Sequence, residues 1–266
     1  MSLPARSSVM TQTPTKMIFA EPPAFGSVEQ ERLDRKQRLA VALRVFARFG
    51  FDMGVAGHIT ARDPEYPDRF WVNPFGLHFG AMRASDLILV DHDGRVVAGD
   101  GILNTAAFRI HSEVHAARPD VVAAAHAHSV YGSAWSAMNR PLQPLTNEGC
   151  MFFEDHVIHD EHTGVTLEDL KAKAIAQDLG PHRAAVLRNH GVVTVGQSVD
   201  EAAWWFIAFE HSAHVQFLAE SAGSPRPAEP EDARAVRDTM GTPRAAWFSF
   251  QPLYQEIVRN QPDVLD

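Results

Sequence analysis

The sequence is short of cysteine, of long apolar runs and of clustered positive charge. Cys150 is the only cysteine among 266 residues, which excludes an intramolecular disulfide framework and is typical of a reducing compartment. No window of about 18 apolar residues could span a membrane, and the polar start up to Thr15 lacks the apolar core of a signal peptide. These absences predict a cytoplasmic protein without a membrane partner.

The charge balance also excludes a class of partner. The formal net charge is -9 and the isoelectric point is about 5.8, and no cluster of Lys and Arg is interleaved with aromatic residues. A nucleic-acid surface is therefore not expected. Hydrophobic residues make up 45% of the chain, enough for a core that folds alone, so small molecules are the expected partners.

Apolar periodicity and turn signals predict an α/β fold, with helices around a mostly antiparallel sheet. The turn between two of the strands contains Asp93-Gly94, because glycine readily supplies the positive φ of a tight hairpin. The predicted helices cover residues 28–49, 104–117, 129–138, 167–179 and 198–222. The predicted strands cover residues 55–61, 70–73, 88–91, 95–98, 121–126, 184–188 and 192–195.

The composition divides the chain into three parts. Residues 1–28 are expected to form an N-terminal arm, because four prolines deny it a long element. Residues 29–222 are expected to form the catalytic domain, and residues 223–266, rich in Pro, Ala and charge, a C-terminal helical extension. The longest helix carries many aromatic residues, which fill the core or form a subunit interface: Trp204, Trp205, Phe206, Phe209 and Phe217.

Two histidines lie two positions apart in a predicted strand. Side chains at i and i+2 of a strand point to the same face, so His126 and His128 can bind one metal ion together. His190 follows another apolar run and offers a third imidazole. Three neutral imidazoles with open coordination positions are typical of a catalytic site for Zn, Mn, Fe or Co, and we expect zinc. The alternative is a pair of histidines on a solvated strand face.

Six short motifs follow one another as in the class II aldolase/adducin family, which the chain resembles from about residue 30 to residue 220. They are Gly57-His58-Ile59-Thr60, Asn73-Pro74-Phe75-Gly76, Ser85-Asp86-Leu87, Arg118-Pro119-Asp120, His126-Ala127-His128 and Asn189-His190-Gly191. The resemblance implies a three-layer α-β-α fold and a homotetramer. It also implies a divalent metal bound by His126, His128 and His190.

The sequence departs from the sugar-phosphate aldolases of that family in two respects. The position of their catalytic glutamate, about nineteen residues before the first metal histidine, is Ala107. Where they bind phosphate, hydroxyl side chains are lost, and a phenyl ring and an imidazole are gained. We therefore expect a non-phosphorylated aromatic or keto-acid substrate, contacted by His58, Asn73 and Phe75.

Glu148 is the candidate general acid and base. The segment Leu145-Thr146-Asn147-Glu148 resembles the Thr-x-Gln-Glu segment of the family's methylthioribulose-phosphate dehydratases, whose glutamate transfers protons. A nearby cation favours the ionised carboxylate and burial opposes it, so its pKa can lie near neutral pH. The alternative is a surface carboxylate with no part in the reaction.

Four other histidines fall outside this set. His111 and His115 are spaced i, i+4 on a predicted helix, and we expect a structural role for both. His156 and His159 are expected in a loop, either at the pocket mouth or simply solvated.

The predicted function is that of a metal-dependent lyase. A cation that polarises a carbonyl stabilises the enolate formed when a neighbouring bond breaks, which serves aldol cleavage, decarboxylation and dehydration. One alternative is a non-haem Fe(II) oxygenase on the same three histidines, since the family resemblance extends to an oxygenase of aminocoumarin biosynthesis. The other is a non-catalytic adducin-like interaction module, which Ala107 favours.

Overall fold

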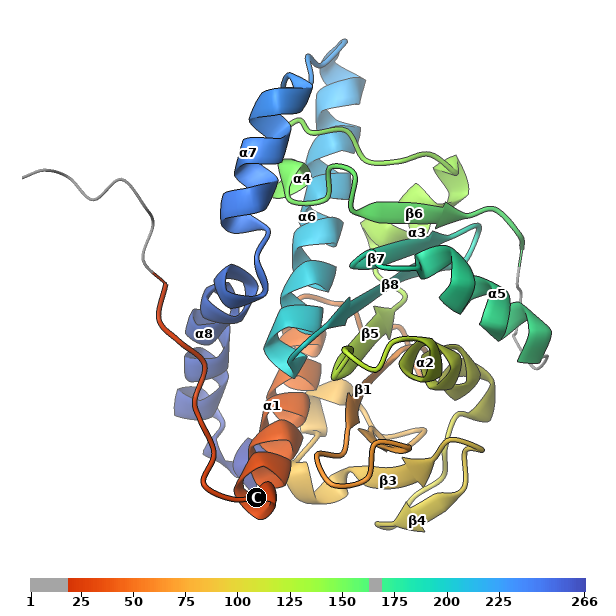
Figure 1. The fold of residues 1–266 in the computed structure, drawn as a ribbon, viewed down its shortest axis with the longest axis vertical. Coiled ribbons are helices and arrows are strands. Elements are labelled where there is room, and N and C mark those ends of the chain that lie inside the picture. The colour runs from red at the N-terminus through yellow and green to blue at the C-terminus, as the bar shows by residue number, and fades with distance from the viewer. Residues whose placement is uncertain (1–18, 163–168) are drawn as a thin grey trace, which may run out of the picture.

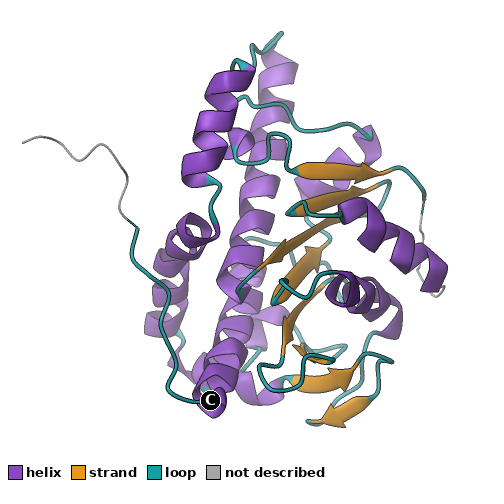
Figure 2. Cartoon of the chain, viewed as in Figure 1, coloured by secondary structure: helices purple, strands orange, loops and turns teal. Residues whose placement is uncertain are grey.

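The computed structural model describes residues 19–162 and 169–266, which form three layers (Figure 1). Within these residues, one eight-stranded sheet has the order β4-β3-β2-β1-β5-β8-β7-β6. Helices α2 and α5 cover one face and α1, α3 and α6 cover the other, while α8 packs on α1 and α6 (Figures 1 and 2). The predicted three-layer α/β fold is confirmed. The sheet is mixed, because β6 and β7 pair in parallel while the other neighbours run antiparallel.

The strands are short and, except for β6, lie close to their predicted positions. They are β1 His58–Arg62, β2 Arg69–Val72, β3 Ile88–Asp91, β4 Val96–Ala98, β5 Ala123–Ala127, β6 His156–His159, β7 Ala184–Leu187 and β8 Gly191–Gly196. The hairpin turn between β3 and β4 is also confirmed, since Gly94 has a φ of 83°.

The helices agree with the sequence except at α4 and at the end of the chain. They are α1 Val28–Arg48, α2 Thr105–Ala117, α3 Val130–Met138, α4 Asn147–Cys150, α5 Asp169–Leu179, α6 Val199–Ala222, α7 Pro230–Met240 and α8 Pro243–Asn260. Residues 167 and 168 of one predicted helix lie outside the described residues. The helix α4 was not expected, and the extension holds two helices rather than one. In the described ranges, no helix combines the length and apolar character needed to cross a bilayer.

The two faces of β1 and β5 carry different side chains. Ile59 and Ala125 point towards α1 and α6 and are fully buried in the larger core. Alternate residues point the other way, so His58, Thr60 and His126 face α2. The central strands therefore present an apolar face to one layer and a row of polar side chains to the other.

The C-terminal extension packs on the domain rather than standing apart. Helix α8 lies against α1 and α6, and Phe250 is fully buried in their shared core. The C-terminus lies beside α1, where the side-chain amide of Gln37 donates to the carbonyl of Leu265 at 3.0 Å (Figure 1). The described part of the arm follows α8, with the rings of Phe19 and Phe248 5.7 Å apart. Residues 1–18 of the predicted arm lie outside the described residues, and the three-part division stays a prediction.

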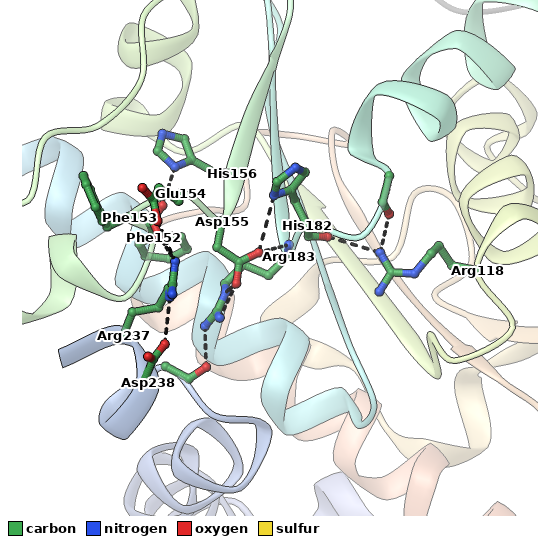
Figure 3. A network of polar contacts seen from close by, with 12 residues as sticks. Arg118, Phe152, Phe153, Glu154, Asp155, His156, His182, Arg183, Arg237 and Asp238 are labelled. Carbon is green, nitrogen blue, oxygen red and sulfur yellow. Dashed lines mark hydrogen bonds and ion pairs between the residues drawn. The ribbon is translucent and has the colours of Figure 1, made fainter. Parts of the chain in front are cut away.

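An ion pair at the edge of the sheet holds β6 (Figure 3). Asp155 precedes β6 and Arg183 precedes β7, and Nε of Arg183 donates to the carboxylate of Asp155 at 2.8 Å. The same arginine donates to the carbonyl of Gly241, between α7 and α8, at 2.8 Å. Parallel pairing begins at the residues that follow the ion pair. The loop predicted for His156 and His159 is wrong, because contacts distant in sequence stabilise this edge strand.

A buried carboxylate anchors the segment that follows β5. Glu210 of α6, only 7% exposed, accepts hydrogen bonds from the hydroxyl of Ser129 at 2.6 Å and the backbone N–H of Tyr131 at 2.9 Å. It also accepts from the N–H of Gly132. These N–H groups belong to the first turn of α3, where helix geometry leaves them without partners and favours negative charge. Helix α6 thereby fixes the chain directly after His128.

We expect Glu210→Ala to lower the free energy of unfolding by about 2–3 kcal/mol, because it leaves buried donors without an acceptor. Urea unfolding followed by circular dichroism measures the loss. Glu220→Ala is the matched control: Glu220 lies on the same helix but forms a half-exposed ion pair with Arg140, and its removal costs less than about 1 kcal/mol. Equal losses in the two variants would contradict the anchoring role.

Candidate metal centre

The structure brings together the three histidines that the sequence predicts as metal ligands. His126 ends the polar row of β5, His128 follows the strand, and His190 lies in the turn before β8. One ligand atom from each lies within 4.8 Å of the other two. The ring centroid of His190 is 4.8 Å from that of His126 and 5.2 Å from that of His128. Two nitrogens at about 2.1 Å from one zinc ion lie at most about 4.2 Å apart, so small side-chain rotations close this cluster on a cation.

The backbone of β8 decides which nitrogen of His126 faces the cluster. Nδ1 of His126 lies 2.9 Å from the carbonyl oxygen of Val192. A carbonyl only accepts, so Nδ1 carries the proton and Nε2 keeps its lone pair. The pairing of β5 with β8, in which Ala127 lies opposite Val192, puts that carbonyl in place. Such a bond orients an imidazole for metal binding.

Two residues of the turn Asn189-His190-Gly191 suit its backbone conformation and its close packing. Asn189 has a φ of 57°, a left-handed conformation that asparagine tolerates. At Gly191 an added Cβ would lie 3.3 Å from Cε1 of His126, so glycine leaves room for that ring. The turn therefore places the imidazole of His190 beside that of His126.

Burial holds the three imidazoles in the neutral form that binds metals. Burial, reinforced by neighbouring histidines, lowers the pKa of His126 well below its ordinary value. Burial alone lowers the pKa of His128, and burial together with His128 lowers the pKa of His190 to about 4. Nδ1 of His190 is buried and accepts no hydrogen bond from the described part of the chain. Neutral donors and an orphaned buried nitrogen fit a divalent cation.

A cavity of about 430 Å³ opens onto the three histidines. Its walls are mostly apolar, and no Lys or Arg of the described ranges lines it. The lining residues other than the three histidines are Val55, Ala56, Gly57, His58, Phe75, Asn104, Ala106, Ile110, His111 and Asn189. The cavity therefore suits a ligand with an apolar body, and its walls offer no cationic side chain to a phosphate.

Two of the three residues predicted to bind substrate line this cavity. They are His58, which is buried, and Phe75, which is 38% exposed. Asn73 does not line it, because its side-chain oxygen accepts the backbone N–H of Ile59 at 3.3 Å and the residue faces a smaller neighbouring cavity. The geometry gives Asn73 a structural task, and contact of all three with substrate stays a prediction.

Glu148 lies away from the three histidines. It belongs to α4 and lines a separate cavity of about 520 Å³ on the α6 side, together with Phe49, Tyr131 and Trp204. Within one copy of the chain, the predicted acid and base therefore does not line the metal cavity. Its catalytic role stays a prediction and requires a second copy to bring the carboxylate there.

The sequence predicts only a structural role for His111, yet this residue lines the metal cavity. Nδ1 of His111 and Nε2 of His115 lie 2.8 Å and 2.9 Å from the hydroxyl of Thr60. The i, i+4 spacing on a helix facing alternate residues of β1 was the available signal. His156 and His159 lie on β6 and line no part of this cavity.

The sequence profile of the Class II Aldolase and Adducin N-terminal domain matches residues 37–217. The chain belongs to the class II aldolase/adducin family. Among solved structures, L-fuculose 1-phosphate aldolase from Glaciozyma antarctica PI12 superposes with a TM-score of 0.86 and is 42% identical, covering 92% of this chain and 96% of that chain.

Two curated relatives match nearly the whole chain. The 4-hydroxy-3-prenylphenylpyruvate oxygenase/4-hydroxy-3-prenylbenzoate synthase of Streptomyces roseochromogenus subsp. oscitans is 45% identical over 260 residues, which is 97% of this chain and 94% of that protein. Decarboxylase NovR of Streptomyces niveus is 45% identical over 260 residues, or 97% of this chain and 96% of that protein. These similarities support an enzyme with metal-dependent, lyase-like chemistry, in a family whose members are typically oligomeric.

We expect the purified protein to carry about one divalent metal ion per chain, because three neutral imidazoles converge. Elemental analysis by mass spectrometry measures the content. His126→Ala and His190→Ala should reduce it by more than tenfold, whereas His78→Ala, which removes an exposed histidine that lines neither the metal cavity nor the cavity of Glu148, should leave it unchanged. Full occupancy in His190→Ala would contradict the three-histidine site.

Proposed function

We propose that this chain is a metal-dependent lyase acting on a non-phosphorylated aryl keto acid. The observation that carries the proposal is the cavity over the three histidines, which is walled by apolar side chains and without Lys or Arg in the described ranges. A phosphate ester would find no cationic partner there except the metal. The name of one 45% identical relative refers to a phenylpyruvate and supports the same substrate class, and the name of the other, a decarboxylase, supports a lyase reaction.

The site residues have separate proposed roles in metal binding and substrate contact. His126, His128 and His190 hold the cation, and zinc is our first choice. When bound, the cation would supply Lewis acidity to a carbonyl oxygen, which would stabilise the enolate left when the bond between the α and β carbons breaks. Phe75 contacts the apolar body of the substrate, and His58 lies beside the reacting end, its ring 5.9 Å from that of His126.

An oxygenase on the same three histidines is the second candidate. The printed name of one relative includes an oxygenase activity, and imidazole ligands also suit iron. The two candidates share the cavity and differ in whether oxygen is consumed.

We expect the zinc-loaded or iron-loaded protein to turn over 4-hydroxy-4-phenyl-2-oxobutanoate, an aryl keto acid that aldol cleavage splits into benzaldehyde and pyruvate, at least about tenfold faster than L-fuculose 1-phosphate, because the cavity lacks cationic side chains. Chromatography of the products and an oxygen electrode measure the reaction. Release of benzaldehyde and pyruvate without oxygen uptake supports the lyase, and oxygen uptake with 4-hydroxyphenylpyruvate and Fe(II) alone supports the oxygenase. Faster cleavage of the sugar phosphate would overturn the proposed substrate class.

We further propose a cytoplasmic homotetramer in which a second copy brings Glu148 to the metal cavity. The cavity that contains Glu148 is lined by the apolar residues Phe51, Trp204 and Leu253, and aromatic residues are enriched at subunit interfaces. Trp205 and Phe209 fill the core instead, so the aromatic helix α6 serves both of its predicted purposes in this proposal. An isologous interface would bury both cavities at once.

Mixing two inactive variants tests this assembly. Glu148→Gln and His126→Ala should each reduce turnover by more than about a hundredfold. If one site needs Glu148 from one copy and His126 from another, chains mixed at random should recover roughly a quarter of the activity. Light scattering checks that each variant keeps the wild-type mass. Full activity of Glu148→Gln, or no recovery on mixing, would contradict a shared site.

A further inference from the structure

We infer that His111 presents a fixed hydrogen-bond acceptor to the ligand in the metal cavity, and so favours ligands that carry a hydroxyl group there. The inference takes its ligand class from the proposed function. It rests on a buried chain of hydrogen bonds in which His115, Thr60 and His111 are linked in that order. The orientation of that chain can be worked out one bond at a time.

The tautomer of His115, which lies at one end of this series of hydrogen bonds, is fixed by its neighbours. Nδ1 of His115 lies 3.4 Å from the carbonyl of Val121, and 3.4 Å from Nη2 of Arg62. Nη2 has two protons, and it donates to the carbonyls of His115 at 2.8 Å and Arg118 at 3.2 Å. No proton of Nη2 is left for the ring, so Nδ1 of His115 is the donor to Val121 and Nε2 keeps its lone pair.

The hydroxyl of Thr60 passes this orientation on to His111. A hydroxyl has one proton, and the bare Nε2 of His115, 2.9 Å away, accepts it. The oxygen of Thr60 then accepts from His111, whose Nδ1 lies 2.8 Å away and carries the proton. A neutral imidazole has one N–H, so Nε2 of His111 has a free lone pair.

His111 is neutral, its Nε2 is buried, and the residue lines the metal cavity. Its side chain is fully buried, and burial, reinforced by the nearby imidazoles of His58 and His126, lowers its pKa well below the ordinary value. Burial also lowers the pKa of His115 to about 3. Nε2 of His111 has no hydrogen-bond partner in residues 19–162 and 169–266, and the residue lines the metal cavity. The ring of His58 lies 3.8 Å away and keeps it in place.

A buried acceptor without a partner discriminates between ligands. A ligand hydroxyl that donates to Nε2 of His111 satisfies it, whereas an ether or a ketone oxygen at that place leaves two acceptors facing each other. Sites built to hydrogen-bond one group reject analogues without it, because the buried polar atom then stays unpaired. Thr60 and His115 are positioning residues in this scheme, since they act through the tautomer of His111.

Magic-angle-spinning NMR of zinc-loaded protein with labelled histidine tests the tautomer without any ligand. The spectrum of His111→Phe assigns the signals of His111. We expect protonated Nδ1 and bare Nε2 in the wild type. In Thr60→Val, which keeps the side-chain shape, we expect the second tautomer to become populated. Protonated Nε2 in the wild-type protein would overturn the inference, whatever the enzyme's substrate.

A pair of probes tests the selectivity. Calorimetry on the zinc-loaded protein compares 3-phenyllactate with its O-methyl ether, which differs in lacking the donor. The Kd of the ether divided by the Kd of 3-phenyllactate should fall by about five- to tenfold in His111→Phe and by a smaller factor in Thr60→Val, at unchanged zinc content. An unchanged ratio in both variants would overturn the inference. Failure of both probes to bind the wild type would contradict the proposed substrate class, and the NMR result would still decide the tautomer.

Discussion

The pairing of β5 between β1 and β8 is the constraint on which the site depends. His126 lies opposite His58 on one side and Val193 on the other, and a backbone carbonyl of β8 accepts a hydrogen bond from its ring. A shift of one residue in this register would turn His126 into the apolar layer beneath α6. The small side chains of residues 123–125 let the helices pack closely on the same strand. Packing and ligand geometry are therefore fixed together.

The site is built from neutral groups, and this follows from its burial. The buried imidazoles on this face of the sheet stay neutral, because water does not solvate their charged form. Since the described cavity wall contains no Lys or Arg, the bound cation is the only positive charge that an acidic ligand meets. In the proposed reaction, recognition of a carboxylate and activation of the neighbouring carbonyl would both depend on one ion, while the apolar walls, Phe75 among them, would select the body of the ligand.

The sequence predicts what depends on local periodicity and misses what depends on distant contacts. Strand alternation puts His126 and His128 on one face, and the motif order adds His190. The sequence does not predict the edge strand β6, because this strand depends on the ion pair between Asp155 and Arg183, which lie 28 positions apart. The sequence predicts only a structural role for His111, because its orientation depends on Thr60, 51 positions earlier. No pattern in the twenty positions between His128 and Glu148 predicts that the chain passes to the face of the sheet covered by α6.

That crossing limits how protons can move in this enzyme. Helices α3 and α4 take Glu148 to the side of the sheet covered by α6, away from the cavity on the α2 side. The neutral imidazole of His111 can only accept a proton through its bare nitrogen. Bond cleavage next to a carbonyl ends with a proton delivered to carbon, which needs a donor as well as an acceptor. A carboxyl group from a second copy would supply the donor, so the proposed shared site and the fixed tautomer complete one another.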